Sequence, residues 1–188
     1  MNKYAELVKE FNDTFCPEAT TTIYKKLILE EFAEWWLEWA SEDYKEEQEL
    51  KELVDLMYVV YGYAHVKGLQ LYVKNSELTK IARDIKPQYS HSLILGAYIE
   101  WLDSKDPEWL QNLSTACIAY ANFRGWLLVE AFTRVHNSNM SKLGPDNKPI
   151  RRSDGKVEKG PNYMAPNLTN LIKKSNEKRK TTLLLPKM

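Results

Sequence analysis

The sequence has few of the residues that cross-link a chain or interrupt its helices. Among 188 residues there are two cysteines, seven glycines and eight prolines. Cys16 and Cys117 lie far apart, and neither belongs to a C-x-x-C motif or a Cys/His spacing. We therefore expect two reduced thiols rather than a disulfide or a zinc site.

The sequence also lacks an excess of either charge and any long apolar run. Twenty-six Lys and Arg balance 26 Asp and Glu, so nothing global attracts nucleic acid or an anionic membrane. No segment reaches the roughly 18 apolar residues of a membrane span, and the N-terminus lacks the apolar run of a signal peptide. We expect a soluble, cytoplasmic protein with no membrane or nucleic-acid partner.

The scarce glycines are unevenly placed, and this indicates a helical body followed by an irregular segment. Four lie in the first 140 residues, whereas residues 144–166 are crowded with turn formers. No stretch alternates with period two for long enough to predict a sheet. We predict an all-α domain over residues 1–178 with a basic loop at 144–166 and a flexible tail at 179–188. The expected helices cover about 2–11, 20–40, 43–66, 88–103, 107–142 and 167–177.

Two pairs of acidic residues stand out on consecutive predicted helices. Glu31 with Glu34, and Glu52 with Asp55, are each three residues apart, so each pair shares a helix face. Like charges at this spacing repel, and the repulsion grows with burial. The pattern predicts a cation that offsets this repulsion.

The surrounding apolar residues place both pairs beside the core. On the first helix the predicted apolar sector contains Ile28, Leu29, Phe32, Ala33, Trp36 and Trp39. Ser41 or Asp43 is expected to cap the second helix. Two helices with a short connection pack antiparallel, which can bring the acidic edges together around Mg²⁺ or Mn²⁺. The alternative is a solvated acidic face, because Glu is a good helix former; spacing alone does not decide between them.

Two stretches of the sequence resemble a known superfamily. Glu30-Glu31-x-x-Glu34 followed by Glu52-x-x-Asp55 is similar to the EExxE…ExxD signature of MazG-like pyrophosphohydrolases, which include dimeric dUTPases and phosphoribosyl-ATP pyrophosphohydrolases. The segments 135–142, 154–157 and 159–163 resemble the C-terminal part of the phosphoribosyl-ATP-pyrophosphohydrolase-like branch, whose activities include deoxynucleoside triphosphate hydrolysis. The resemblance covers about 20–68 and 125–168, and it leaves residues 69–107 as an insert.

This resemblance implies a MazG-like helical bundle and assigns roles to individual residues. The implied metal ligands are Glu31, Glu34, Glu52 and Asp55, with Glu30 and Glu34 acting in catalysis. Glu30 would orient or deprotonate the attacking water, although a solvent-exposed, inactive Glu30 is the alternative. The expected substrate-binding residues are Lys142, Lys156 and Lys159 for phosphates, Asn139 for the base or sugar, Tyr163 in the same segment, and Trp35 for stacking on a base.

The implied reaction is Mg²⁺-dependent cleavage of a (d)NTP between the α and β phosphates, giving a (d)NMP and pyrophosphate. Family analogy puts dUTP and dCTP first among the bases, without excluding dATP or dGTP. Two alternatives remain open: a phosphoribosyl-ATP pyrophosphohydrolase and a non-catalytic helical interaction protein. We also expect a homodimer or a dimer of dimers, and structural roles for His65, His91 and His136.

Overall fold

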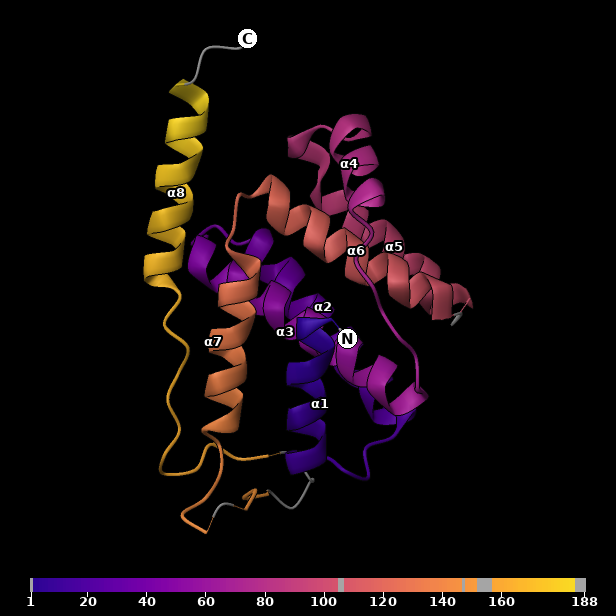
Figure 1. Cartoon of the computed structure of the whole chain (residues 1–188), viewed down its shortest axis with the longest axis vertical. Coiled ribbons are helices and arrows are strands. Elements are labelled where there is room, and N and C mark those ends of the chain that lie inside the picture. The colour runs from indigo at the N-terminus through magenta and orange to yellow at the C-terminus, as the bar shows by residue number, and fades with distance from the viewer. Residues whose placement is uncertain (1, 105–106, 147, 152–156, 185–188) are drawn as a thin grey trace.

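The structure, a computed structural model, describes residues 2–104, 107–146, 148–151 and 157–184 (Figure 1). These residues form eight α-helices and one short 3-10 helix, with β pairing limited to two isolated bridges. The predicted all-α class is confirmed. The helices are α1 (Lys3–Phe15), α2 (Thr21–Trp39), α3 (Glu46–Lys67), α4 (Asn75–Asp84), η1 (Pro87–Tyr89), α5 (His91–Ser104), α6 (Pro107–Phe123), α7 (Leu128–Met140) and α8 (Thr169–Leu184).

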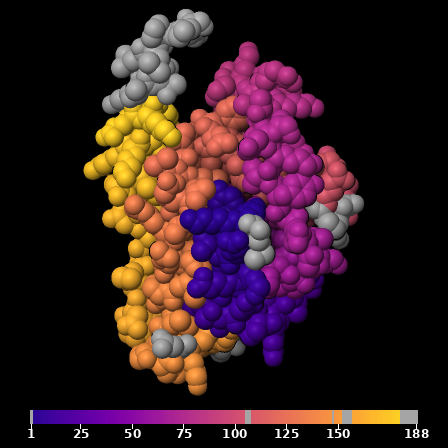
Figure 2. Space-filling model, viewed as in Figure 1, coloured from indigo at the N-terminus to yellow at the C-terminus, as the bar shows by residue number. Residues whose placement is uncertain are grey.

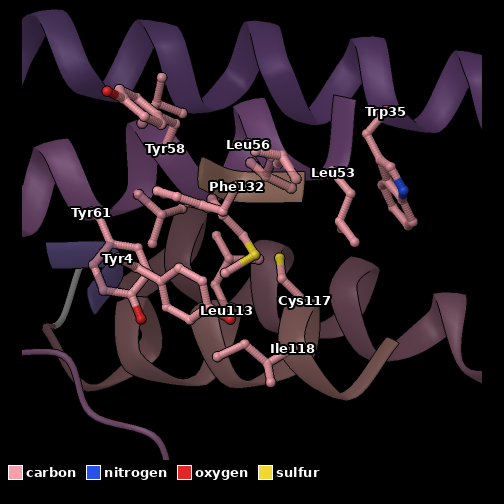
Figure 3. Packing of buried hydrophobic residues seen from close by; sticks show 14 of the residues in the cluster. Tyr4, Trp35, Leu53, Leu56, Tyr58, Tyr61, Leu113, Cys117, Ile118 and Phe132 are labelled. Atoms are coloured by element: carbon pink, nitrogen blue, oxygen red, sulfur yellow. The ribbon is translucent and has the colours of Figure 1, made fainter. Parts of the chain in front are cut away.

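Helix α3 lies at the centre of the molecule. From residue 52 to residue 64 every side of it is buried except at Asp55, as expected for a helix that is surrounded by others. Helices α1, α2, α6 and α7 pack against it. In the core, Leu56 and Tyr61 of α3 lie near Phe132 of α7 and Leu113 of α6 (Figure 3).

Helix α1 closes one side of this core. Figure 2 shows it on the surface, between the orange segment around α7 and the magenta segment that includes α4. Its Tyr4 ring lies 4.8 Å from Phe132 and 5.6 Å from Tyr61, centroid to centroid. Among the described residues, no helix combines the length and apolarity needed to cross a bilayer.

Local signals set the ends of α2 and α3. The Thr20 side chain caps α2 by accepting from the backbone N–H of Ile23 at 3.4 Å. Helix α3 ends at Gly68, whose φ of 71° is a left-handed conformation that favours glycine. The predicted cap at Ser41 or Asp43 is wrong, because α3 begins only at Glu46.

Three other helix predictions need correction. The long helix expected over 107–142 is two helices, because Gly125 takes a φ of 65° and turns the chain between α6 and α7. The last helix continues to Leu184 instead of ending near residue 177, so residues 179–184 are helical rather than a loose tail. Helix α4 was not predicted.

The buried face of α2 is also rotated from the prediction. The side chains it buries are those of Tyr24, Ile28, Phe32 and Trp35. Leu29 and Ala33, which were assigned to the apolar sector, are exposed. The reason is tertiary: Trp35 packs edge-on against Tyr120 of α6 at 5.5 Å, and a single helix cannot reveal where such a partner will lie.

Candidate active site

Three carboxylates from α2 and α3 converge at the edge of the core. One oxygen each from Glu31, Glu52 and Asp55 lies within 4.8 Å of the others. We call these three residues the carboxylate cluster. Helix α2 supplies Glu31 and α3 supplies the other two, so the packing of these helices creates the cluster.

The cluster is electrostatically strained. Burial raises the pKa of Glu31 to about 8, and the neighbouring Asp55, Glu34 and Glu52 add to the shift. Burial also raises the pKa of Glu52. The Glu52 side chain is buried, and its Oε2 has no hydrogen-bond partner in the part of the chain that the structure describes. A buried carboxylate oxygen without a hydrogen-bond donor destabilises the folded state. A cation bound at the cluster would reduce this cost.

One cation is already present. The ammonium group of Lys51 donates to Glu52 Oε1 and to Asp55 Oδ2, each at 2.8 Å. Although burial lowers it, the contacts with Asp55 and Glu52 raise the pKa of Lys51 above its usual value. Lys51 is therefore protonated at neutral pH and offsets part of the negative charge of Glu52 and Asp55.

The other two predicted acidic residues lie outside the cluster. Glu34 is exposed, and its charge contributes to the raised pKa values of Glu31 and Glu52 from a distance. Glu30 is also exposed, and it lines the cavity described next. Neither side chain joins the cluster in the conformation that the structure shows.

A cavity of about 600 Å³ adjoins the carboxylate cluster. We call it the central pocket. Its acidic lining comes from Glu30, Glu31 and Asp55, with Lys51 among them. Its apolar and aromatic lining comes from α1, α2, α3 and α7: Phe11, Ile23, Tyr24, Leu27, Tyr58, Val59 and Val135.

Basic side chains from the segment after α7 line the same pocket: Lys142, Arg151 and Lys159. In Figure 1 this orange segment runs below the C-terminal end of α1, where Arg151 donates to the backbone carbonyl of Phe15. Burial lowers the pKa of Lys142, against the opposing effect of Asp55. The central pocket thus has both carboxylates and cations on its walls.

Other residues predicted for substrate binding are placed as follows. Asn139 and Tyr163 line the central pocket. Asn139 Oδ1 accepts from Lys142 Nζ at 2.7 Å, and the ammonium of Lys159 lies 4.7 Å from the centre of the Tyr163 ring. Lys156 lies outside the described residues.

The prediction that Trp35 stacks on a base is wrong. Its side chain is 0% exposed and is enclosed by Phe32, Trp36 and Tyr120. It follows Glu34 in sequence, but one helical step turns it from the acidic edge into the core. The aromatic side chains that do reach the pocket are those of Phe11, Tyr24, Tyr58 and Tyr163.

Tyr58, which lines the pocket, is the first residue of a chain of polar contacts that continues to His136 and Glu10. Tyr58 Oη lies 3.0 Å from Nδ1 of His136, and Nε2 of His136 lies 3.4 Å from Glu10. Burial lowers the pKa of His136, while Glu10 opposes that shift. His136 is buried and does not line the pocket, whereas its partner Tyr58 does.

Sequence reasoning missed two charged residues of this site. Lys51 was overlooked, although its spacing of four residues from Asp55 allows a helical ion pair. Arg151 lies in the basic segment, but nothing in the sequence distinguishes it from its neighbours there. Its contact with Phe15 joins segments that are distant in the chain.

Comparison with known proteins gives one match. The family model described as Phosphoribosyl-ATP pyrophosphohydrolase matches residues 8–80, which contain the C-terminal part of α1, all of α2 and α3, and the carboxylate cluster. The match reaches into the segment predicted as an insert, and it does not include residues 125–168. No curated protein and no solved structure gives a significant match.

Proposed function

We propose that the chain is a Mg²⁺-dependent nucleoside triphosphate pyrophosphohydrolase, since residues 8–80 match the family model of phosphoribosyl-ATP pyrophosphohydrolases. It would cleave a (d)NTP between the α and β phosphates to give a (d)NMP and pyrophosphate. The observation that carries this proposal is the central pocket, which places Glu31 and Asp55 in the same cavity as Lys142 and Lys159.

The carboxylate cluster fits a hard divalent cation. Carboxylate oxygens are the ligands that Mg²⁺ and Mn²⁺ prefer, and Glu52 offers a buried oxygen without a donor among the described residues. An ion held there would supply charge neutralisation for the polyphosphate and Lewis-acid activation of a water molecule. We propose Glu34 as a fourth ligand, which requires its exposed side chain to turn toward the cluster.

The chain's own residues would bind and orient the substrate around this centre. Lys142, Lys159 and Arg151 would donate charge-assisted hydrogen bonds to phosphate oxygens. Asn139 would hydrogen-bond the base or sugar. Glu30, exposed at the pocket wall, would orient the attacking water and accept its proton.

The apolar lining of the central pocket replaces Trp35 as the proposed binding site of the nucleobase. Tyr24, Leu27 and Tyr58 line the pocket together with Phe11. A flat base buried against such side chains gains from area burial and from aromatic contacts. We propose that the base lies in this apolar part while the triphosphate extends toward the cluster.

Phosphoribosyl-ATP is the second candidate substrate, and the family match favours it. Its cleavage breaks the same kind of phosphoanhydride bond and would use the same ligands and cations. The two candidates differ in the group beyond the base, so a direct comparison of turnover separates them.

The test is a product assay with both kinds of substrate. The protein is incubated with each canonical NTP and dNTP, with dUTP and with phosphoribosyl-ATP, in Mg²⁺ or EDTA, and the products are resolved by ion exchange. We expect Mg²⁺-dependent release of a monophosphate and pyrophosphate, lost in Glu52→Gln and Asp55→Asn and retained in the exposed control Glu100→Gln. Absence of turnover for every substrate would reject the enzyme and favour the interaction protein.

We also propose that the chain assembles at least as a dimer. Leu29 and Leu37 on α2 and Ile99 and Leu102 on α5 are exposed large apolar side chains. The two helices are neighbours, because the rings of Phe32 and Tyr98 stack at 3.7 Å. Exposed apolar side chains on neighbouring helices are available to an interface with a second copy of the chain. A molar mass near 22.0 kDa by light scattering would reject this proposal.

A further inference from the structure

Lys51 occupies a position that differs from that of an ordinary surface lysine. Its ammonium group contacts two members of the carboxylate cluster at once, Glu52 and Asp55, each at 2.8 Å. Its side chain is 34% exposed and lines the central pocket. One end of the residue is thus bound to the cluster while the rest lies along an open cavity.

Another lysine in the chain provides a direct comparison. Lys9 pairs with Asp13 at the same four-residue spacing, but there both side chains are about half exposed and only one carboxylate takes part. Such surface pairs contribute little to stability because solvent screens them. At Lys51 the partners are much less exposed, at 10% for Glu52 and 22% for Asp55.

The charges at the cluster remain unbalanced with Lys51 in place. Glu52 and Asp55 share one ammonium group, and Oε2 of Glu52 has no hydrogen-bond partner within the described part of the chain. One ammonium group therefore leaves net negative charge at the cluster, which favours the binding of a divalent cation. That cation would need the oxygens that Lys51 holds, because a hard divalent ion binds through several carboxylate oxygens.

We propose that Lys51 is a built-in counter-ion that competes with the divalent ion for Glu52 and Asp55. This inference rests on the proposed metal site. In the metal-free protein the ammonium group keeps the carboxylates together against their mutual repulsion. When the ion binds, electrostatic repulsion moves the ammonium group away, and its flexible four-carbon stem lets it remain in the central pocket. There it adds to the cations available to a polyphosphate.

The test measures metal affinity directly, without activity. Binding of Mn²⁺ is followed by the electron paramagnetic resonance of the free ion for wild type and for Lys51→Met. We expect Lys51→Met to bind Mn²⁺ about tenfold more tightly, because no partly buried ion pair has to be broken first. In EDTA the same variant should melt a few degrees lower than wild type, and saturating Mn²⁺ should remove that difference.

Two controls keep the result interpretable. Lys9→Met removes a comparable helical pair and should leave Mn²⁺ affinity unchanged. Lys51→Gln retains a hydrogen-bond donor without the charge, so it replaces Lys51→Met if the latter does not fold. In wild type, ¹⁵N NMR of the lysine ammonium groups should show one signal, assigned to Lys51 by its absence from the variant, that shifts as Mg²⁺ is added.

The possible failures are distinct. If wild type binds Mn²⁺ and both Lys51 variants bind it equally or more weakly, Lys51 positions the ligands instead of competing, and the inference is overturned. If neither wild type nor the variants bind Mn²⁺, the metal site itself is rejected together with the inference.

Discussion

Replacing Glu31 with glutamine should stabilise the metal-free protein at neutral pH. The folded state raises the pKa of Glu31 to about 8 from an ordinary 4.5, mainly through burial. Between these values the folded protein keeps a proton on Glu31 that the unfolded chain has released. The free energy of unfolding of wild type therefore decreases as the pH rises through this window. Glutamine is neutral at every pH and removes this penalty.

The magnitude follows from the two pKa values. Each pH unit between them removes about 1.4 kcal/mol, so the ceiling at pH 7 is about 3 kcal/mol. Glu31 is partly exposed, and solvent screening reduces the effect to about 1–2 kcal/mol. For a domain of this size that corresponds to a rise of roughly 2–8 °C in the melting temperature.

The assay is urea unfolding in EDTA, followed by circular dichroism from about pH 5 to about pH 8. The stability advantage of Glu31→Gln over wild type should be small at the acid end and grow toward the alkaline end. His136, whose pKa burial lowers, affects both proteins alike and cancels in the difference. Glu38→Gln on the same helix should follow wild type. Parallel stability curves for wild type and Glu31→Gln would refute the reasoning.

Three further substitutions test the packing around the site, each by urea unfolding. Gly62→Ala should lower the free energy of unfolding by about 1–3 kcal/mol, because a Cβ there would lie 2.1 Å from the Tyr24 ring. An unchanged urea midpoint would contradict this close contact. Glu49→Gln should lower the free energy of unfolding by about 3 kcal/mol, because Glu49 is fully buried and pairs with Arg124 at 3.3 Å. A decrease below about 1 kcal/mol would argue against a buried ion pair. Glu47→Ala should lower the free energy of unfolding by about 1 kcal/mol and speed hydrogen exchange at Leu168, just before α8, because Glu47 accepts a hydrogen bond from the Leu168 N–H at 3.1 Å; unchanged exchange there would show that other contacts hold this segment.

The carboxylate cluster could be anticipated from the sequence because it depends on local geometry. A three-residue spacing places Glu52 and Asp55 on one face of any α-helix, and a short connection brings the preceding helix alongside. Of the other predicted pair, Glu31 joins them in the structure and Glu34 does not. Burial, rather than the number of acidic residues, separates Glu31 from the exposed Glu34.

What could not be anticipated depends on segments far along the chain. Trp35 is buried because Tyr120 packs on it from α6, and no pattern within α2 reveals that contact. The break at Gly125 was missed because a single glycine within an apolar run is often tolerated in a helix. Its φ of 65° is known only once α6 and α7 are packed.

Four of the five acidic residues of α3 follow one another at intervals of three: Glu46, Glu49, Glu52 and Asp55. The first two are held by arginines, with Arg179 of α8 at 2.8 Å from Glu46 and Arg124 at 3.3 Å from Glu49. The last two contact Lys51. The contacts that join α8 to α3 and those within the carboxylate cluster therefore use different acidic residues of the same helix.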